Sequence, residues 1–218
     1  IHISVVVALV GVMQAVAPVV ANLHGAGRDA EVANVLQQGF WLAALLTVPG
    51  VLFLLHPGAV LGLAGMAPAV EIKVRAYLGL LAWGLPAALA YRTFYAFCNA
   101  LGKPRVLMII GLLSLIVHAG LAWGLALEGW FGEPMGVAGC ALSNVIIAWS
   151  ACLGAALYLH FGPLGARYQP FRHWAKPSWR RWRELLRLGL PMGLSNLIEI
   201  TAFTLVSLFV AALGAAVV

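Results

Sequence analysis

Long apolar runs are the feature that most limits what this chain can fold into. Six of them follow one another along the 218 residues, and each is about as long as the 20 or so residues that a helix needs to cross a bilayer. Barrel strands would alternate apolar and polar residues over about ten positions, which these runs do not. The sequence therefore predicts membrane-spanning helices over residues 1–23, 35–55, 76–97, 106–127, 136–159 and 185–218.

The composition excludes an ordinary soluble domain. Hydrophobic residues make up 63% of the chain and charged residues 9%, whereas about 25% of a typical soluble domain is charged. We therefore predict an all-α fold, a polytopic transmembrane helix bundle. The chain starts at Ile1 and ends at Val218 inside apolar runs, so we expect it to be an internal piece of a longer protein.

The charges between the predicted spans indicate an orientation. Ten of the 13 Lys and Arg residues fall in loops on one side, around Arg28, around Lys103 and over Arg167–Arg187. Lys73 and Arg75 fall on the other side. Because cytoplasmic loops of membrane proteins carry the excess of Lys and Arg, we predict that the side with these ten basic residues is cytoplasmic.

The longest loop, residues 161–184, mixes basic and aromatic residues. Such mixing can bind nucleic acid, but it also suits a linker lying against anionic lipid with its Trp side chains at the interface. We favour the second interpretation and expect membrane lipids, not nucleic acid, as partners. The predicted organisation is one lobe over residues 1–160, a basic linker over 161–184, and the first helix of a second lobe over 185–218.

Glu199 is the candidate site residue that stands out. It lies about ten residues inside the last apolar run, near the predicted middle of the membrane. A carboxylate costs several kcal/mol there, so it is expected to hold a proton or bind a cation. The structural alternative is a neutral side chain that hydrogen-bonds between helices.

Other polar residues within the spans are weaker candidates. Arg92 can anchor a helix end or take part in gating, and His118 can form an interhelical hydrogen bond or relay a proton. We expect the polar residues that line a cavity to come from Gln14, Arg92, His118, Asn144, Asn196 and Thr201.

Several motifs, in order along nearly the whole chain, resemble the multidrug and toxic compound extrusion (MATE) family. The runs are AVAPVVANLHGAGRDAEV at 15–32, QQGFWLA at 37–43, YRTFYAFCNALGKPR at 91–105, GVAGCALSNVIIAW at 136–149 and LRLGLPMGLSNLIEITAF at 186–203. The resemblance implies twelve helices in two six-helix lobes, of which this chain would hold helices two to seven. It also implies a multi-pass protein of the bacterial inner membrane that acts as a monomer.

The same resemblance implies a function. Members of the NorM-like branch export amphipathic or cationic drugs in exchange for Na⁺ or H⁺, and Glu199 matches their seventh-helix carboxylate. No cofactor is implied beyond the coupling ion, and no metal beyond Na⁺ at Glu199. The chain departs from the family where polar residues four apart are common in the fifth helix, because it has His118 and Ala122 there. The acidic residues of the first and tenth helices lie outside the chain.

Two other functions stay open at this stage. One is a flippase for lipid-linked oligosaccharides, although such proteins line their cavity with several Arg residues and only Arg92 is available here. The other is a membrane scaffold that transports nothing. An enzyme is not expected, since the chain has no Ser-His-Asp pattern or phosphate loop and GAGR lacks the strand–turn–helix context of a nucleotide motif.

Overall fold

The structure is a computed structural model, and it describes residues 2–57, 68–128, 135–171 and 174–212. Within these residues the regular structure is entirely helical. The elements, in chain order, are α1 (His2–Met13), α2 (Val16–Gly25), α3 (Asp29–Leu55), α5 (Pro68–Ala100), α6 (Pro104–Trp123), the π-helical turn η1 (Gly124–Glu128), α7 (Val137–Phe161), α8 (Pro163–Tyr168) and α9 (Trp179–Ala212).

Six helical spans among the described residues are long and apolar enough to cross a membrane. They match the six predicted spans, but several helices extend past the apolar runs. Thus α3 begins at Asp29 and not at 35, and α9 begins at Trp179 and not at 185. Hydropathy detects only the part of a helix that needs lipid, whereas a helix continues into polar surroundings while its backbone bonds are satisfied.

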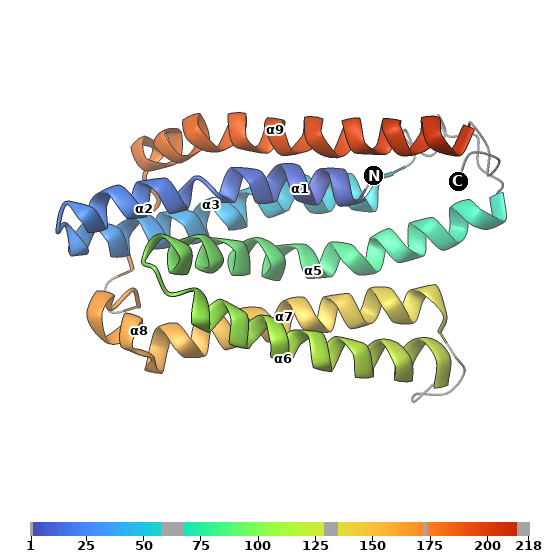
Figure 1. The fold of residues 1–218 in the computed structure, drawn as a ribbon, viewed down its shortest axis with the longest axis horizontal. Helices are drawn as coiled ribbons and strands as arrows, with labels where there is room; N and C mark the ends of the chain where they lie inside the picture. Colours follow the sequence, from blue (N-terminus) through green and yellow to red (C-terminus); the bar gives the residue numbers. More distant parts are fainter. Residues whose placement is uncertain (1, 58–67, 129–134, 172–173, 213–218) are drawn as a thin grey trace.

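The first predicted span is divided into α1 and α2, which meet at Gln14 and Ala15. Pro18 explains the break, because it lacks the N–H that would bond to the carbonyl of Gln14 and its ring crowds that carbonyl. The freed carbonyl of Gln14 accepts a hydrogen bond from Ala17 N at 3.0 Å instead. The two halves nevertheless continue in nearly one direction (Figure 1).

The core lies where α1, α2, α3 and α5 meet. Its fully buried side chains include Leu36, Leu42, Phe94 and Phe97. In Figure 1, α5 runs through the middle of the bundle, α6 and α7 cover one side of it, and α9 lies along α1 on the other.

The span formed by α6 is the least buried of the six, since only 6% of its most apolar stretch of residues is buried inside the bundle. It presents a row of large exposed side chains, among them Met108, Leu112, Leu115 and Ile116. In a protein with lipid as its solvent, this face is suited to acyl chains.

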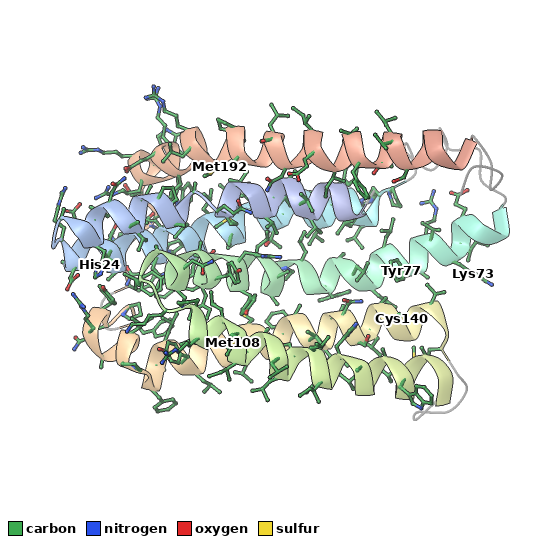
Figure 2. The ribbon with its side chains drawn as sticks, in the orientation of Figure 1. His24, Lys73, Tyr77, Met108, Cys140 and Met192 are labelled. Atoms are coloured by element: carbon green, nitrogen blue, oxygen red, sulfur yellow. The ribbon has the colours of Figure 1, made fainter. Side chains whose placement is uncertain are left out.

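The basic loops lie at one end of the bundle. The turns after α2 and α5 and the segment between α7 and α9 gather there (Figure 1). His24 lies at this end, whereas Lys73 lies at the opposite end (Figure 2). This arrangement, with the basic loops together at one end, is the one that the predicted orientation requires.

Candidate transport site

Glu199 lies on α9, well inside the helix rather than at either end. It lies twelve positions after Arg187, the last basic residue of α9, which corresponds to about 18 Å along the helix axis. The hydrocarbon core of a bilayer is about 30 Å thick. If Arg187 lies at the membrane surface, the carboxylate is therefore near mid-membrane. Its side chain is exposed, and it forms no hydrogen bond or ion pair with another of the described residues.

Backbone-to-backbone packing of α9 on α1 positions the region around Glu199. A Cβ atom added to Gly193 would lie 2.6 Å from the carbonyl oxygen of Ala8, and one added to Gly189 would lie 2.5 Å from that of Val12. A Cβ atom added to Gly11 would likewise lie 2.5 Å from Cα of Gly193. Small residues let helices approach this closely in lipid, where dispersion contacts replace the hydrophobic effect as the main attraction.

Helical geometry decides which polar neighbours Glu199 has. Asn196 and Ser195 lie three and four residues before it, so they share its side of the helix, and Asn196 reaches the contact with α1. Thr201 lies two residues after Glu199 and therefore on nearly the opposite side. Its hydroxyl donates a 2.7 Å hydrogen bond to the carbonyl of Leu197. The structure thus brings the predicted Asn196, together with Ser195, to the side of Glu199, whereas the predicted Thr201 lies away from it.

Asn144 lines a cavity of about 350 Å³ between α1, α5 and α7. Its amide nitrogen donates a 2.9 Å hydrogen bond to the carbonyl of Cys140, one turn earlier on α7. The walls are mostly apolar and come from residues such as Leu81, Leu85 and Val145, with Tyr77 adding a second polar group. A mostly apolar hollow with a few polar groups is the usual form of a small-molecule site.

A second cavity, of about 320 Å³, lies between α3, α5 and α7 and is almost wholly apolar. Phe171 and Trp174, from the segment between α8 and α9, close one side of it. Their rings stack with centroids 6.0 Å apart, and Trp174 also stacks on Phe40 of α3 at 6.4 Å. The segment between α8 and α9 therefore contributes part of the wall of this cavity.

Gln14, Arg92 and His118 line neither of these two cavities. Gln14 is exposed at the break between α1 and α2. Arg92 is exposed on α5. Its guanidinium lies 5.5 Å from the ring centroid of Tyr95, a cation–π geometry that suits a structural role for Arg92 rather than a role in gating. His118 is half-buried on α6, and its Nδ1 atom is buried without a hydrogen bond.

The most extensive polar contact in the described residues involves two side chains that were not among the site residues predicted from the sequence. Gln37 and Gln38, on α3, are 3% and 0% exposed. They bond to the backbone of residues 170–178, which we call the strap; residues 172 and 173 of it lie outside the described residues.

Each glutamine pairs with the strap through both ends of its amide. Gln38 donates to the carbonyl of Lys176 at 2.8 Å and accepts from Ser178 N at 2.8 Å. Gln37 donates to the carbonyl of Pro170 and accepts from Ala175 N at 3.0 Å. The indole of Trp41 adds a 3.1 Å bond to the carbonyl of Ala175. An adjacent pair of glutamines in an apolar run was the available sequence clue, but its partner lies about 135 residues away.

Ion pairs reinforce this end of the bundle. Arg167 of α8 pairs with Asp29 of α3 at 2.9 Å, and the hydrogen bond with that carboxylate raises the pKa of Arg167. Tyr168 is hydrogen-bonded to Nδ1 of His24 at 3.0 Å, and burial raises the pKa of its hydroxyl. Arg181 of α9 pairs with Glu31 of α3 at 2.6 Å. Within the described residues, no three His, Cys, Asp or Glu side chains are placed to hold a metal ion together.

Six apolar helical spans with hollows between them, and polar contacts confined largely to one end, define a multi-pass helical membrane protein. The family model MatE matches residues 1–123, which is more than half of the sequence. The chain belongs to the MatE family.

Curated relatives support the same assignment over nearly the full chain. A protein of Aromatoleum aromaticum described as "Probable multidrug resistance protein NorM" is 48% identical over 216 residues, covering 99% of this chain and 46% of the relative. "Multidrug resistance protein NorM" of Aliivibrio fischeri is 34% identical over 210 residues, covering 96% and 45%. The chain thus spans about half the length of the curated relatives that it matches.

Solved structures share the fold. A structure described as the inward-facing conformation of a multidrug resistance MATE family transporter matches with a TM-score of 0.76 at 19% identity, over 89% of this chain and 43% of the other. The eukaryotic MATE transporter AtDTX14 also matches at 0.76, with 20% identity, over 94% and 44%. The predicted family and the predicted helical fold are therefore confirmed.

Proposed function

We propose that this chain is part of a secondary active multidrug efflux transporter. It would supply the first lobe, the linker and the first helix of the second lobe. The observation that carries the proposal is the 48% identity to a protein described as a probable multidrug resistance protein NorM, which extends over 99% of the chain. The protein would export amphipathic or cationic compounds from the cytoplasm of a bacterium, across the inner membrane.

We assign the coupling of transport to an ion gradient to Glu199. A carboxylate at mid-membrane depth is stabilised by a bound Na⁺ or by a proton, and each alternative removes its net charge. Asn196 and Ser195, on the same side of α9, would add oxygen ligands. Since α9 is held on α1 by glycine contacts, a change in the charge of Glu199 would alter how α9 packs against a second lobe that covers its exposed side.

Alternating access supplies the mechanism. Repeat-built transporters place their site between two lobes and expose it to one side of the membrane at a time. Ion binding at Glu199 can shift this equilibrium only if the ion binds one arrangement more tightly than the other. The Asn144 cavity and the apolar cavity beneath Trp174 are candidate contact surfaces for the apolar parts of a substrate.

The test is drug efflux from cells that express the complete protein. Glu199→Gln removes the charge but keeps the shape, so efflux driven by a Na⁺ or pH gradient should fall to background. Glu71→Gln is the matched control, because Glu71 pairs with Arg75 on an exposed face of α5 and should leave efflux unchanged. If the Glu199 variant transports normally with the same ion dependence, Glu199 is not the coupling residue. If the unaltered protein transports no drug, the efflux proposal itself is wrong.

A further inference from the structure

A polar cavity of about 740 Å³ lies where the strap meets the start of α9 and the N-terminal part of α3. It is separate from Glu199 and from the two mostly apolar hollows. Its walls combine charged and polar side chains at the end of the bundle that carries the basic loops. Neither the proposed transport site nor the helix packing accounts for it.

Four of the charged groups in its wall neutralise one another. Arg181 pairs with Glu31 at 2.6 Å and with Glu184 at 3.0 Å. Arg28 pairs with Glu31 as well. Two cations and two carboxylates therefore form a connected network with no formal net charge, and the carboxylates do not present unpaired negative charge to the cavity.

Four other lining side chains have no such partner. The cavity is also lined by Lys176, Arg180, Asn34 and Ser178, and in the part of the chain that the structure describes their side chains form no hydrogen bond or ion pair with another residue. Two of these groups are cations and two are neutral hydrogen-bond donors. The cavity therefore offers a formal charge of +2 and several unused donors, which is the complement of a phosphate group.

The surroundings indicate where that phosphate comes from. The cavity lies beside Trp179, which is 69% exposed and begins a helix that becomes apolar after Arg187. Trp is enriched at the level of the lipid headgroups, and clusters of Lys and Arg next to a span attract anionic lipid. We propose that this cavity binds the phosphate of an anionic phospholipid headgroup, with Lys176 and Arg180 as its principal cationic contacts.

The proposal goes beyond transport, but it requires the basic end of the bundle to lie at the membrane surface. Such a lipid would bridge the strap, through Lys176 and Ser178, and α9, through Arg180. It would thereby join the linker to the first helix after it. The network around Arg181 would hold the cavity open and leave Lys176 and Arg180 available.

The experiment measures lipid binding to the complete protein purified in detergent. Native mass spectrometry would follow titrations with phosphatidylglycerol, with phosphatidylcholine and with inorganic phosphate. The variant K176Q/R180Q removes both unpaired cations. R183Q/R187Q is the matched control, because it removes the same charge from two exposed positions of α9 that do not line the cavity.

Phosphatidylglycerol should bind the unaltered protein and R183Q/R187Q alike, and K176Q/R180Q about tenfold more weakly or worse. The charge-conserving variant K176R/R180K should retain binding, which separates lost charge from misfolding. Equal losses in K176Q/R180Q and R183Q/R187Q would mean that general surface charge attracts the lipid, and would overturn the proposal. Inorganic phosphate or phosphatidylcholine binding as tightly as phosphatidylglycerol would overturn it too.

Discussion

Two of the contacts that hold helix α9 on the rest of the chain differ in kind. Along its middle it packs on α1 through Gly11, Gly189 and Gly193, with backbone nearly touching backbone. At its start it follows the strap, which two glutamines and a tryptophan hold by hydrogen bonds to its peptide groups. The first contact depends on close packing of small residues, and the second depends on hydrogen bonds.

The two contacts differ because their surroundings differ: the glycine contact lies among the apolar spans, and the strap lies at the basic end of the bundle. At membrane depth water is absent, so exposed polar groups are costly and close packing of small residues is the available attraction. At the basic end the strap is irregular backbone whose N–H and C=O groups need partners. Glutamine suits that task, since its amide carries a donor and an acceptor that can satisfy both kinds of peptide group. These two contacts should therefore respond differently to substitution.

The largest effect is expected at the glycine contact. Gly193→Leu would place side-chain atoms where the carbonyl of Ala8 now lies, and overpacking of this kind costs about 3 kcal/mol. We expect a large fall in the thermal stability of the purified protein and the loss of a disulfide cross-link engineered between α1 and α9. Gly154→Leu is the control, because a Cβ atom there meets nothing within 4 Å. Equal stability of the two variants would show that α1 and α9 do not pack closely.

A smaller effect is expected from the strap. Q37A/Q38A would leave peptide groups of the strap without partners, at about 1–3 kcal/mol for each group that stays buried. The strap should then detach locally, while the helices keep their packing. Limited proteolysis should cut near residues 170–178 much faster than in the unaltered protein. Gln14→Ala, at an exposed glutamine, should not change the cleavage rate; comparable cleavage in both variants would contradict the role of Gln37 and Gln38.

The smallest effect is expected from the ion pair that joins α9 to α3. The side chains of Arg181 and Glu31 are 27% and 32% exposed, and pairs in contact with water contribute little because solvent and salt screen them. Glu31→Gln should lower the melting temperature only slightly, and raising the salt concentration should shrink the difference between variant and unaltered protein. A change as large as that of Gly193→Leu would mean that the polar end, and not the glycine contact, holds α9 in place.

Much of the fold was predictable because lipid makes such strict demands on a chain. Each apolar run must form a helix long enough to cross the bilayer, so the number and approximate bounds of the spans follow from hydropathy. Pro18 indicates that the first span is interrupted, but it does not show that the helix breaks at Gln14 and Ala15. The early starts of α3 and α9 could not, since polar residues at helix ends carry no apolar pattern.

The candidate site was less predictable. Glu199 stands out in the sequence because a carboxyl group in an apolar run is rare and costly, and its role stays a prediction. Helical geometry then separates Asn196 from Thr201, which share a neighbourhood in sequence but lie on different sides of α9. The sequence did not distinguish Gln37 and Gln38 from the other polar residues of the spans, because the role of each depends on a partner that is distant in the chain.

By itself, the sequence determined the class of this protein: a membrane-spanning helical bundle with a basic end and one acidic residue deep in its last span. Local composition suffices for that, because transfer into lipid is a property of each segment alone. Only the tertiary structure decided that three glycines join α1 to α9, that two glutamines bind the strap, and that Lys176 and Arg180 share a polar cavity. Those contacts join residues far apart in the chain, and no local pattern encodes which distant group a side chain will meet.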